Sequence, residues 1–150
     1  MTIDSIRLEP VTAGNWRDCA ALTVHPEQKE FVAEVTYYLC MCSYGDTWSP
    51  LAAVRGEREV VGFAIWGVDD DGSRWIGGLV VDAKHQRQGI GGAIVRQLRE
   101  RLIAEPGTPN VALSYRPANE GARRLYLALG FVETGETEDD EVVARWTPAS

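Results

Sequence analysis

The chain has 150 residues, enough for a single domain spanning residues 1–150 around one hydrophobic core. Hydrophobic residues make up 45% of it, yet no apolar run reaches about 18 residues, so the sequence excludes a membrane-spanning helix and a membrane partner. The formal net charge of −7 argues against a nucleic-acid partner, because nucleic-acid binders usually carry a basic face.

The cysteines and the first residues favour the cytoplasm. Cys19, Cys40 and Cys42 are odd in number and have no metal-ligand spacing around them, so we expect free thiols and no metal site. The first ten residues lack the basic and apolar segments of a secretory signal. A reducing compartment fits both features.

The first third of the chain predicts one short strand and two helices. Residues 6–9 alternate between apolar and charged side chains, as in a strand. Asn15 can cap a helix over residues 16–22. Apolar side chains then recur at helical spacing from Phe31 to Cys42, which predicts a second helix.

Three neighbouring strands come next. Residues 51–54 and 60–68 are typical of strands, and the charged stretch 55–59 between them is typical of a hairpin turn. Residues 75–82 form the third strand. Its residues 79–81 are apolar on both faces, which predicts a buried central strand.

The last third alternates helices and strands. Asn119 can cap a helix that Gly130 ends. The expected elements are a helix, a strand, a helix and two strands, at residues 94–103, 111–115, 119–129, 131–132 and 141–146. The whole order predicts a mixed α/β (α+β) domain, with about seven strands in a largely antiparallel sheet and about four helices.

Glycines gather where the helix at residues 94–103 is about to begin, in the stretch HQRQGIGGA at residues 85–93. The first turn of a helix has main-chain N–H groups without intrahelical partners, and the helix dipole makes them an anion site. Glycine has no Cβ to hold a phosphate away. Lys84, His85 and Arg87 add local positive charge, so this loop can wrap a pyrophosphate.

Two other phosphate motifs do not fit this loop. A P-loop ends in Gly-Lys-Ser/Thr, whereas this stretch ends in Gly91-Gly92-Ala93. A dinucleotide fingerprint needs a third glycine where Ile94 stands, and a parallel β-α-β context. A simple turn remains the alternative to a ligand site, and the local cations favour the ligand site.

Four blocks of the sequence, with their spacing, resemble the GNAT superfamily of acetyl-CoA-dependent N-acetyltransferases. They are Leu79-Val80-Val81-Asp82, Gln86-x-x-Gly89-x-Gly91, Asn119-x-x-Ala122-x-x-Leu125-Tyr126 and Gly130-Phe131. The resemblance covers most of the chain and implies a GNAT-like fold, acyltransferase activity and acetyl-CoA as co-substrate.

The resemblance also assigns parts of the cofactor site. It implies that residues 86–92 bind the CoA pyrophosphate and that main-chain groups of residues 79–81 pair with the pantetheine arm. It places Asn119 against that arm and Tyr126 near the sulfur, although Asn119 could also be a plain helix cap. The residues expected to bind the cofactor are Leu79, Val80, Val81, Gln86, Arg87, Gln88, Gly89, Ile90, Gly91, Gly92, Asn119 and Tyr126.

A narrower resemblance concerns the acceptor. The blocks Pro26-Glu27-Gln28-x-x-Phe31-Val32-Ala33, Gly62-Phe63 and Thr134-Gly135-Glu136 resemble bacterial spermine/spermidine (diamine) acetyltransferases. They imply acetyl transfer to a primary amine of a small, cationic, polyamine-like partner. An aminoglycoside, an amino acid or a peptide N-terminus remains an alternative acceptor. Dimers are common in the superfamily, which favours a homodimer.

Tyr126 is the candidate general acid for this reaction. A phenol has a pKa near 10, above that of a thiol, so it can donate a proton to the departing sulfur. The alternative is that Tyr126 only completes the apolar face formed with Ala122, Leu125 and Leu129. The family fold also implies a free main-chain N–H near Val81, where two strands diverge, to stabilise the carbonyl oxygen.

Carboxylates are the candidates for holding the amine and removing its proton. Glu30 and Glu34 stand four apart on the predicted second helix, so Glu34 is the candidate base and both can bind a cationic acceptor. The alternative is a solvated helix face. The stretch Asp139-Asp140-Glu141 is either an exposed turn or part of the acceptor rim.

The indole side chains of Trp48, Trp66 and Trp75 could line the acceptor site or fill the core. A different class of function also remains open. The chain could be a non-catalytic acyl-CoA-binding module that acts as a sensor or a partner protein, and the presence of Tyr126 argues against it.

Overall fold

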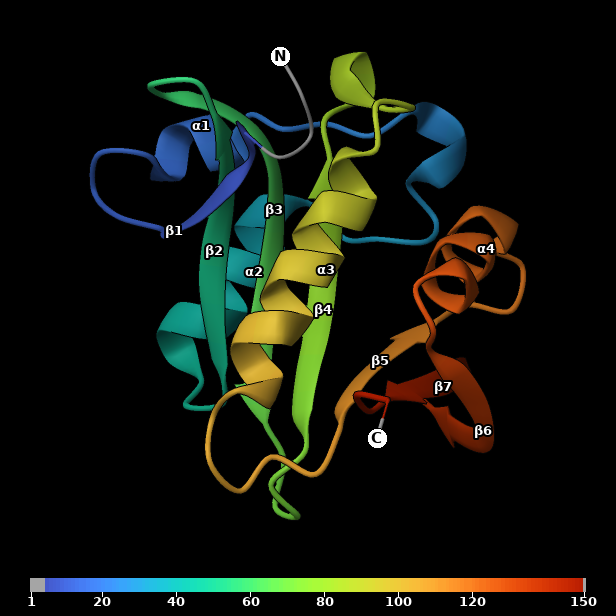
Figure 1. Ribbon diagram of the computed structural model, residues 1–150. Helices are drawn as coiled ribbons and strands as arrows, with labels where there is room; N and C mark the ends of the chain where they lie inside the picture. Colours follow the sequence, from blue (N-terminus) through green and yellow to red (C-terminus); the bar gives the residue numbers. More distant parts are fainter. Residues whose placement is uncertain (1–4, 150) are drawn as a thin grey trace.

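The computed structural model describes residues 5–149 (Figure 1). Its elements in chain order are β1 (Arg7–Pro10), α1 (Trp16–Ala20), η2 (Pro26–Gln28), α2 (Val35–Tyr44), β2 (Trp48–Arg55), β3 (Glu59–Val68), β4 (Arg74–Val81), η3 (Ala83–His85), α3 (Ile90–Ile103), β5 (Val111–Tyr115), α4 (Glu120–Ala128), β6 (Val132–Glu138) and β7 (Glu141–Trp146). Among these described residues, no helix has both the length and the apolar character needed to cross a bilayer.

The strands form one seven-stranded sheet in the order β1-β2-β3-β4-β5-β7-β6. Every neighbouring pair is antiparallel except β4 and β5, which are parallel. This confirms the predicted mixed, largely antiparallel sheet, the four α-helices and the central place of the strand that contains residues 79–81.

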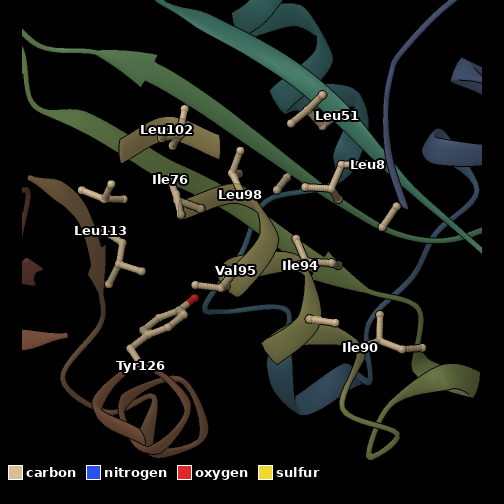
Figure 2. Packing of buried hydrophobic residues seen from close by; sticks show 14 of the residues in the cluster. Leu8, Leu51, Ile76, Ile90, Ile94, Val95, Leu98, Leu102, Leu113 and Tyr126 are labelled. Atoms are coloured by element: carbon tan, nitrogen blue, oxygen red, sulfur yellow. The ribbon is translucent and has the colours of Figure 1, made fainter. Parts of the chain in front are cut away.

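The sheet separates two hydrophobic layers. In Figure 1, α3 lies over one face of β3 and β4, and α1 and α2 lie on the other face of the sheet. The α3 side packs Ile94, Val95 and Leu98 of the predicted apolar face against strand residues such as Ile76 (Figure 2). The other layer includes Cys19 of α1 and Val35 of α2.

The parallel strands β4 and β5 separate soon after they meet. They pair only through Arg74 with Val111 and Trp75 with Ala112. Farther along, β4 carries an extra residue opposite β3, and Gly78 there has a φ of +55°, in the region that favours glycine. Figure 1 shows β5 leading away from β4, toward β7 and α4. The predicted divergence is confirmed, and it begins well before Val81.

The predicted second helix begins later than expected. The sequence predicted a helix from Phe31, but α2 starts at Val35, because Glu34 has an extended backbone with ψ of 150°. The Tyr38 hydroxyl accepts a hydrogen bond from the Ala33 main-chain N–H at 3.0 Å, which holds the preceding segment in a non-helical path. Glu30 and Glu34 therefore do not form one helical row, and this prediction was wrong.

Two smaller boundaries also differ. The helix predicted over residues 16–22 ends at Ala20, and the Asn15 side chain accepts from the Thr12 N–H at 2.8 Å instead of capping it. The strand predicted at residues 131–132 continues to Glu138 as β6. Asp139 and Asp140, with φ of 47° and 68°, form the tight turn that joins it to β7.

Substitution of Gly62 in β3 tests how tightly this strand packs against α3 and β4. A Cβ there would stand 2.7 Å from Ile94 Cδ1 and 3.0 Å from the Val80 carbonyl oxygen. We expect Gly62→Ala to lower the free energy of unfolding by about 1–3 kcal/mol, the usual cost of overpacking. Urea unfolding measures it, with Gly14→Ala, whose Cβ would have 3.6 Å to its nearest neighbour, as the control. Equal stability of the two variants would contradict the expectation.

Candidate active site

Two cavities open where β4 and β5 separate. The loop cavity, of about 440 Å³, lies between the glycine loop, the end of β4 and α4, and is lined in part by Arg87, Gly89 and Gly91. The rim cavity, of about 510 Å³, lies among β3, β4, β5 and the β6–β7 turn, and is lined in part by Trp75 and Glu141. Both lie beside the split in the sheet.

The two cavities meet. Six residues line both of them: Phe31, Val32, Leu79, Asn119, Ala122 and Tyr126. A molecule bound in the loop cavity can therefore contact one bound in the rim cavity at this junction. Of the twelve residues expected to bind the cofactor, all except Val80 and Gln88 line the loop cavity.

The glycine loop is held by side-chain amides. The Gln86 Nε2 donates to the Val81 carbonyl oxygen and to Gln28 Oε1, each at 2.9 Å, and Gln28 Nε2 donates back to Gln86 Oε1 at 3.0 Å. Gln86 thus fixes the loop against the end of β4. The part played by Gln28, 58 residues earlier, was missed, and no local pattern in the sequence signals it.

Two residues in the first turn of α3, Gly91 and Gly92, line the loop cavity and have no Cβ atom. The helix begins at Ile90 after Gly89, whose φ of +78° suits glycine. A Cβ on Gly91 would stand 3.6 Å from Leu125 Cδ2 and from Val81 Cγ2, an ordinary contact distance. Packing within the protein does not require glycine at position 91. Glycine there would let an anion come close to the first-turn N–H groups, so these residues fit a pyrophosphate.

The expected positive cluster is only partly at the site. Arg87 lines the loop cavity. The Lys84 Nζ instead forms an ion pair with Asp82 Oδ2 at 3.8 Å. His85 Nδ1 lies 3.1 Å from an Arg55 guanidinium nitrogen. Arg55 also donates to Gln88 Oε1 at 3.0 Å, which explains why Gln88 does not line the cavity.

Val80 and Ile90 have structural surroundings of their own. The Val80 side chain is 3% exposed and packs in the α1–α2 layer, on the face of the sheet away from α3. Ile90 lines the loop cavity, and its side chain is also buried in the α3 layer. Any contact that Val80 makes with a ligand must therefore come from its main chain.

The rim cavity is acidic. Among the residues that line it are four carboxylates and no lysine, arginine or histidine; the carboxylates are Asp69, Glu138, Asp139 and Glu141. Trp48 and Trp75 line it as well, but Trp66 lies on the opposite face of the sheet. A wall with this charge and these rings favours a cationic ligand.

Tyr126 stands at the junction of the cavities and is 8% exposed. Figure 2 shows its ring extending from α4 toward Val95. The ring packs against Tyr115 and Phe131, with centroids 5.5 and 6.2 Å away. Burial first, and then the negative charge of Glu141, raises the pKa of its hydroxyl above the usual value. The hydroxyl is therefore a proton donor at neutral pH.

Asn119 has the predicted capping role. Its Oδ1 accepts a hydrogen bond from the Ala122 N–H at 3.2 Å, at the start of α4. It also lines both cavities. The cap and a ligand contact are compatible, because a carboxamide side chain has further donors and acceptors.

The predicted acceptor carboxylates lie elsewhere. Glu30 and Glu34 are exposed and line neither cavity. Glu141, which the sequence indicated only as part of an acidic turn, lies partly buried in the rim cavity, and its Oε1 accepts from Ser114 Oγ at 2.7 Å. Ser114 was missed, because pairing between β5 and β7 is needed to bring it near Glu141.

Metal ligands and cysteines play no visible part. Within residues 5–149, no three His, Cys, Asp or Glu side chains are grouped so that they could hold a metal ion. Cys19 is buried, and burial raises the pKa of its thiol to about 11. It stays a protonated packing residue rather than a nucleophile.

Solved structures share this architecture. A spermidine N-acetyltransferase from Vibrio cholerae, in complex with CoA and spermine, has a TM-score of 0.73 at 14% identity, over 95% of this chain and 94% of the other. The aminoglycoside acetyltransferase AAC(6')-Ib, in complex with coenzyme A, has a TM-score of 0.75 at 24% identity, over 95% of each chain. The ribosomal-protein-S18-alanine N-acetyltransferase from Escherichia coli has a TM-score of 0.65 at 21% identity, over 93% and 90%.

The TM-scores show that these proteins share the fold of this chain, and at these sequence identities the likeness shows the fold alone. A search of curated proteins finds no match to the sequence. The family model described as the acetyltransferase (GNAT) family matches residues 14–131, which is most of the chain. The glycine loop, the β4–β5 split and the capped helix with Tyr126 all lie within this match. This protein therefore belongs to the GNAT family of acetyltransferases.

Proposed function

We propose that this protein transfers an acetyl group from acetyl-CoA to a primary amine of a small cationic acceptor of the polyamine kind. One observation carries the proposal: a cavity lined by the glycine loop and Arg87 and a cavity lined by carboxylates meet at residues that include Tyr126. The two substrates have opposite charge, and they must touch at one point for the acetyl group to pass between them.

The loop cavity is the proposed place for acetyl-CoA. The N–H groups at the start of α3, near Gly91 and Gly92, would bind the pyrophosphate, and Arg87 adds positive charge. Main-chain groups of residues 79–81 and the Asn119 side chain would hold the pantetheine arm. When bound, acetyl-CoA supplies an acetyl thioester at the junction of the cavities.

The rim cavity is the proposed place for the acceptor. Its four carboxylates attract an ammonium group, and its tryptophan rings can contact the methylene chain of a polyamine. The neighbouring structures support this class: one is an enzyme in complex with spermine and another is an aminoglycoside acetyltransferase, and both ligand classes carry several amines. An aminoglycoside therefore remains the second acceptor to test.

In the proposed reaction, two groups of the protein act on the thioester. Tyr126 would donate a proton to the departing sulfur, and a main-chain N–H of β4 beside the split would stabilise the carbonyl oxygen. Glu34 stays a prediction as the base, although its exposed position outside both cavities gives it no contact with the junction. The variant Glu34→Gln tests it directly.

An amine panel tests the proposal. We expect thiol release from acetyl-CoA only when an amine is added, with kcat/KM for spermidine at least about fivefold above that for a monoamine, since a second charge adds roughly 1 kcal/mol or more in an acidic cavity. Raising the salt concentration should reduce this preference, because salt screens the carboxylates. An aminoglycoside, an amino acid and a peptide N-terminus complete the panel.

Two results would contradict the proposal. Saturable CoA binding without thiol release for any amine would favour a binding module. A preference for neutral or acidic acceptors, unaffected by salt, would leave an acetyltransferase whose acceptor class is wrong.

A further inference from the structure

We infer that Glu141 is the residue that takes the proton from the acceptor amine before transfer. The inference rests on the proposed function, because it concerns a reaction in the rim cavity. A primary amine has a pKa near 10.4, so only about one molecule in a thousand or fewer is neutral at pH 7. Only the neutral form has a lone pair to attack, and a carboxylate beside the ammonium group can relay its proton to solvent, so that the neutral amine forms inside the cavity, where it can react.

The position of Glu141 suits this step. It begins β7 and lies beside β5, where Ser114 Oγ donates to its Oε1 at 2.7 Å. This bond orients the carboxylate. Within residues 5–149, Oε2 makes no hydrogen bond or ion pair, and the residue lines the rim cavity. One oxygen is therefore fixed and the other is available to an ammonium group.

Glu141 is also close to the junction. Its negative charge helps to raise the pKa of Tyr126 and of Tyr38, two of the tyrosines that line the same cavity. Ser114 is its hydrogen-bond donor. The titratable side chains that line the cavity with it are Tyr38, Tyr115, Tyr126, Asp69, Glu138 and Asp139. Within residues 5–149, no lysine, arginine or histidine lines the cavity, so no such side chain holds the carboxylate in an ion pair there.

The other three carboxylates of the cavity are placed differently. Glu138 and Asp139 are exposed at the β6–β7 turn, where they can hold a distant positive charge of the acceptor. Asp69 is exposed as well, and its two oxygens accept from the Asp70 N–H at 2.8 Å and from Trp75 Nε1 at 3.2 Å. Glu141 is the partly buried member with one oxygen free.

The step balances without a further reactant. An ammonium proton passes to Glu141, and the freed lone pair forms the C–N bond to the acetyl carbon while the C–S bond breaks. The sulfur leaves with the electron pair and takes a proton from Tyr126. Of the three protons on the ammonium group, one stays on the amide and one goes through Glu141 to solvent. The third leaves the nitrogen once the C–N bond has formed, and it replaces, by way of solvent, the proton that Tyr126 gave to the thiol.

The test compares two acceptors with Glu141→Gln. Glutamine still accepts from Ser114 but cannot take a proton at neutral pH. We expect kcat/KM for spermidine at pH 7 to fall roughly 10²–10⁴-fold. An acceptor whose reacting amine is replaced by an aminooxy group is largely neutral at pH 7 and needs no base. We expect its kcat/KM to fall less than about threefold, with mass spectrometry confirming the acetylated position.

A matched control comes from the same turn. Asp140 carries a carboxylate but does not line the rim cavity, and its φ of 68° is one that asparagine tolerates. Asp140→Asn should leave kcat/KM for both acceptors within about twofold of the original protein. Thermal unfolding and CoA binding of each variant show whether the fold is retained. If Glu141→Gln does not fold, Glu141→Asp serves as the second variant, because it draws the carboxylate back by one methylene. We expect it to show the same selective loss of kcat/KM for spermidine.

The outcomes separate the inference from the proposed function. Amine-dependent turnover by the original protein with unchanged spermidine kinetics in Glu141→Gln would overturn the inference and leave the function standing. An equal loss for both acceptors would also overturn it, since Glu141 would then only bind or position the acceptor. Selective loss in Glu34→Gln but not in Glu141→Gln would assign the proton to Glu34. If no amine supports thiol release by the original protein, the function and the inference fail together.

Discussion

Tyr126→Phe is expected to lower kcat for acetyl transfer to a cationic amine by roughly 10²–10⁴-fold, the usual loss when a general acid is removed. The dissociation constant of CoA should not change, because the ring remains in place. The reason lies in the position of Tyr126, which lines both cavities at their junction, where the proposed reaction places the departing sulfur.

The substitution should leave the fold intact. The Tyr126 ring packs between Tyr115 and Phe131, and phenylalanine makes the same ring contacts. Within residues 5–149 its hydroxyl makes no hydrogen bond that the change would break. We therefore expect the free energy of unfolding to stay within about 0.5 kcal/mol. A loss of activity can then be assigned to the missing proton.

The pKa of Tyr126 sets the pH range of this role. Burial and the charge of Glu141 raise the pKa above the usual value near 10, so the hydroxyl keeps its proton throughout the neutral and mildly alkaline range. Between pH 7 and 9, kcat should not fall through loss of this proton. A kcat that falls over this interval in the original protein, and not in Tyr126→Phe, would contradict the assignment.

Stopped-flow or steady-state thiol release measures the effect, and calorimetric titration with CoA measures binding. Tyr37→Phe is the control, because Tyr37 is an exposed tyrosine on α2 that lines neither cavity. An unchanged kcat in Tyr126→Phe would remove Tyr126 from the mechanism. Loss of CoA binding would instead mean that its hydroxyl holds the cofactor.

Local patterns in the sequence predicted most of the fold. The apolar face of α3, the Asn119 cap of α4 and the turn after β2 each depend on residues within a few positions of one another. Such short-range signals survive folding, because the periodicity of apolar residues matches the side that is buried. The glycine loop was predictable for the same reason, since its composition and its place before a helix are local.

The acceptor site could not be predicted in this way. Phe31 continues the helical spacing of α2, but it lines the cavities instead of a helical core, so the pattern suggested a helix that begins too early. The carboxylate at Glu141 depends on Ser114, which pairing of β5 with β7 brings close from 27 residues away. The Gln28–Gln86 pair is likewise a contact between distant segments. Tertiary pairing of this kind has no signature in one sequence.

Gly91→Ala is expected to weaken CoA binding by roughly 10- to 150-fold. Glycine at this position exposes first-turn N–H groups of α3 to the loop cavity, and a methyl group would stand between them and a phosphate. Losing one hydrogen bond to a charged group costs about 1.5–3 kcal/mol, which gives that range of affinity.

The same substitution should not weaken the fold, and this separates binding from stability. The new Cβ would meet Leu125 and Val81 at 3.6 Å, an ordinary contact, and alanine favours a helix over glycine by up to about 1 kcal/mol. Thermal unfolding without ligand should therefore show an equal or higher Tm, while calorimetry shows the weaker binding. Gly14→Ala, outside both cavities, controls for the glycine-to-alanine change itself. A CoA dissociation constant within about threefold of the original would mean that the phosphates do not reach this turn, and the anion site at the start of α3 would have to be abandoned.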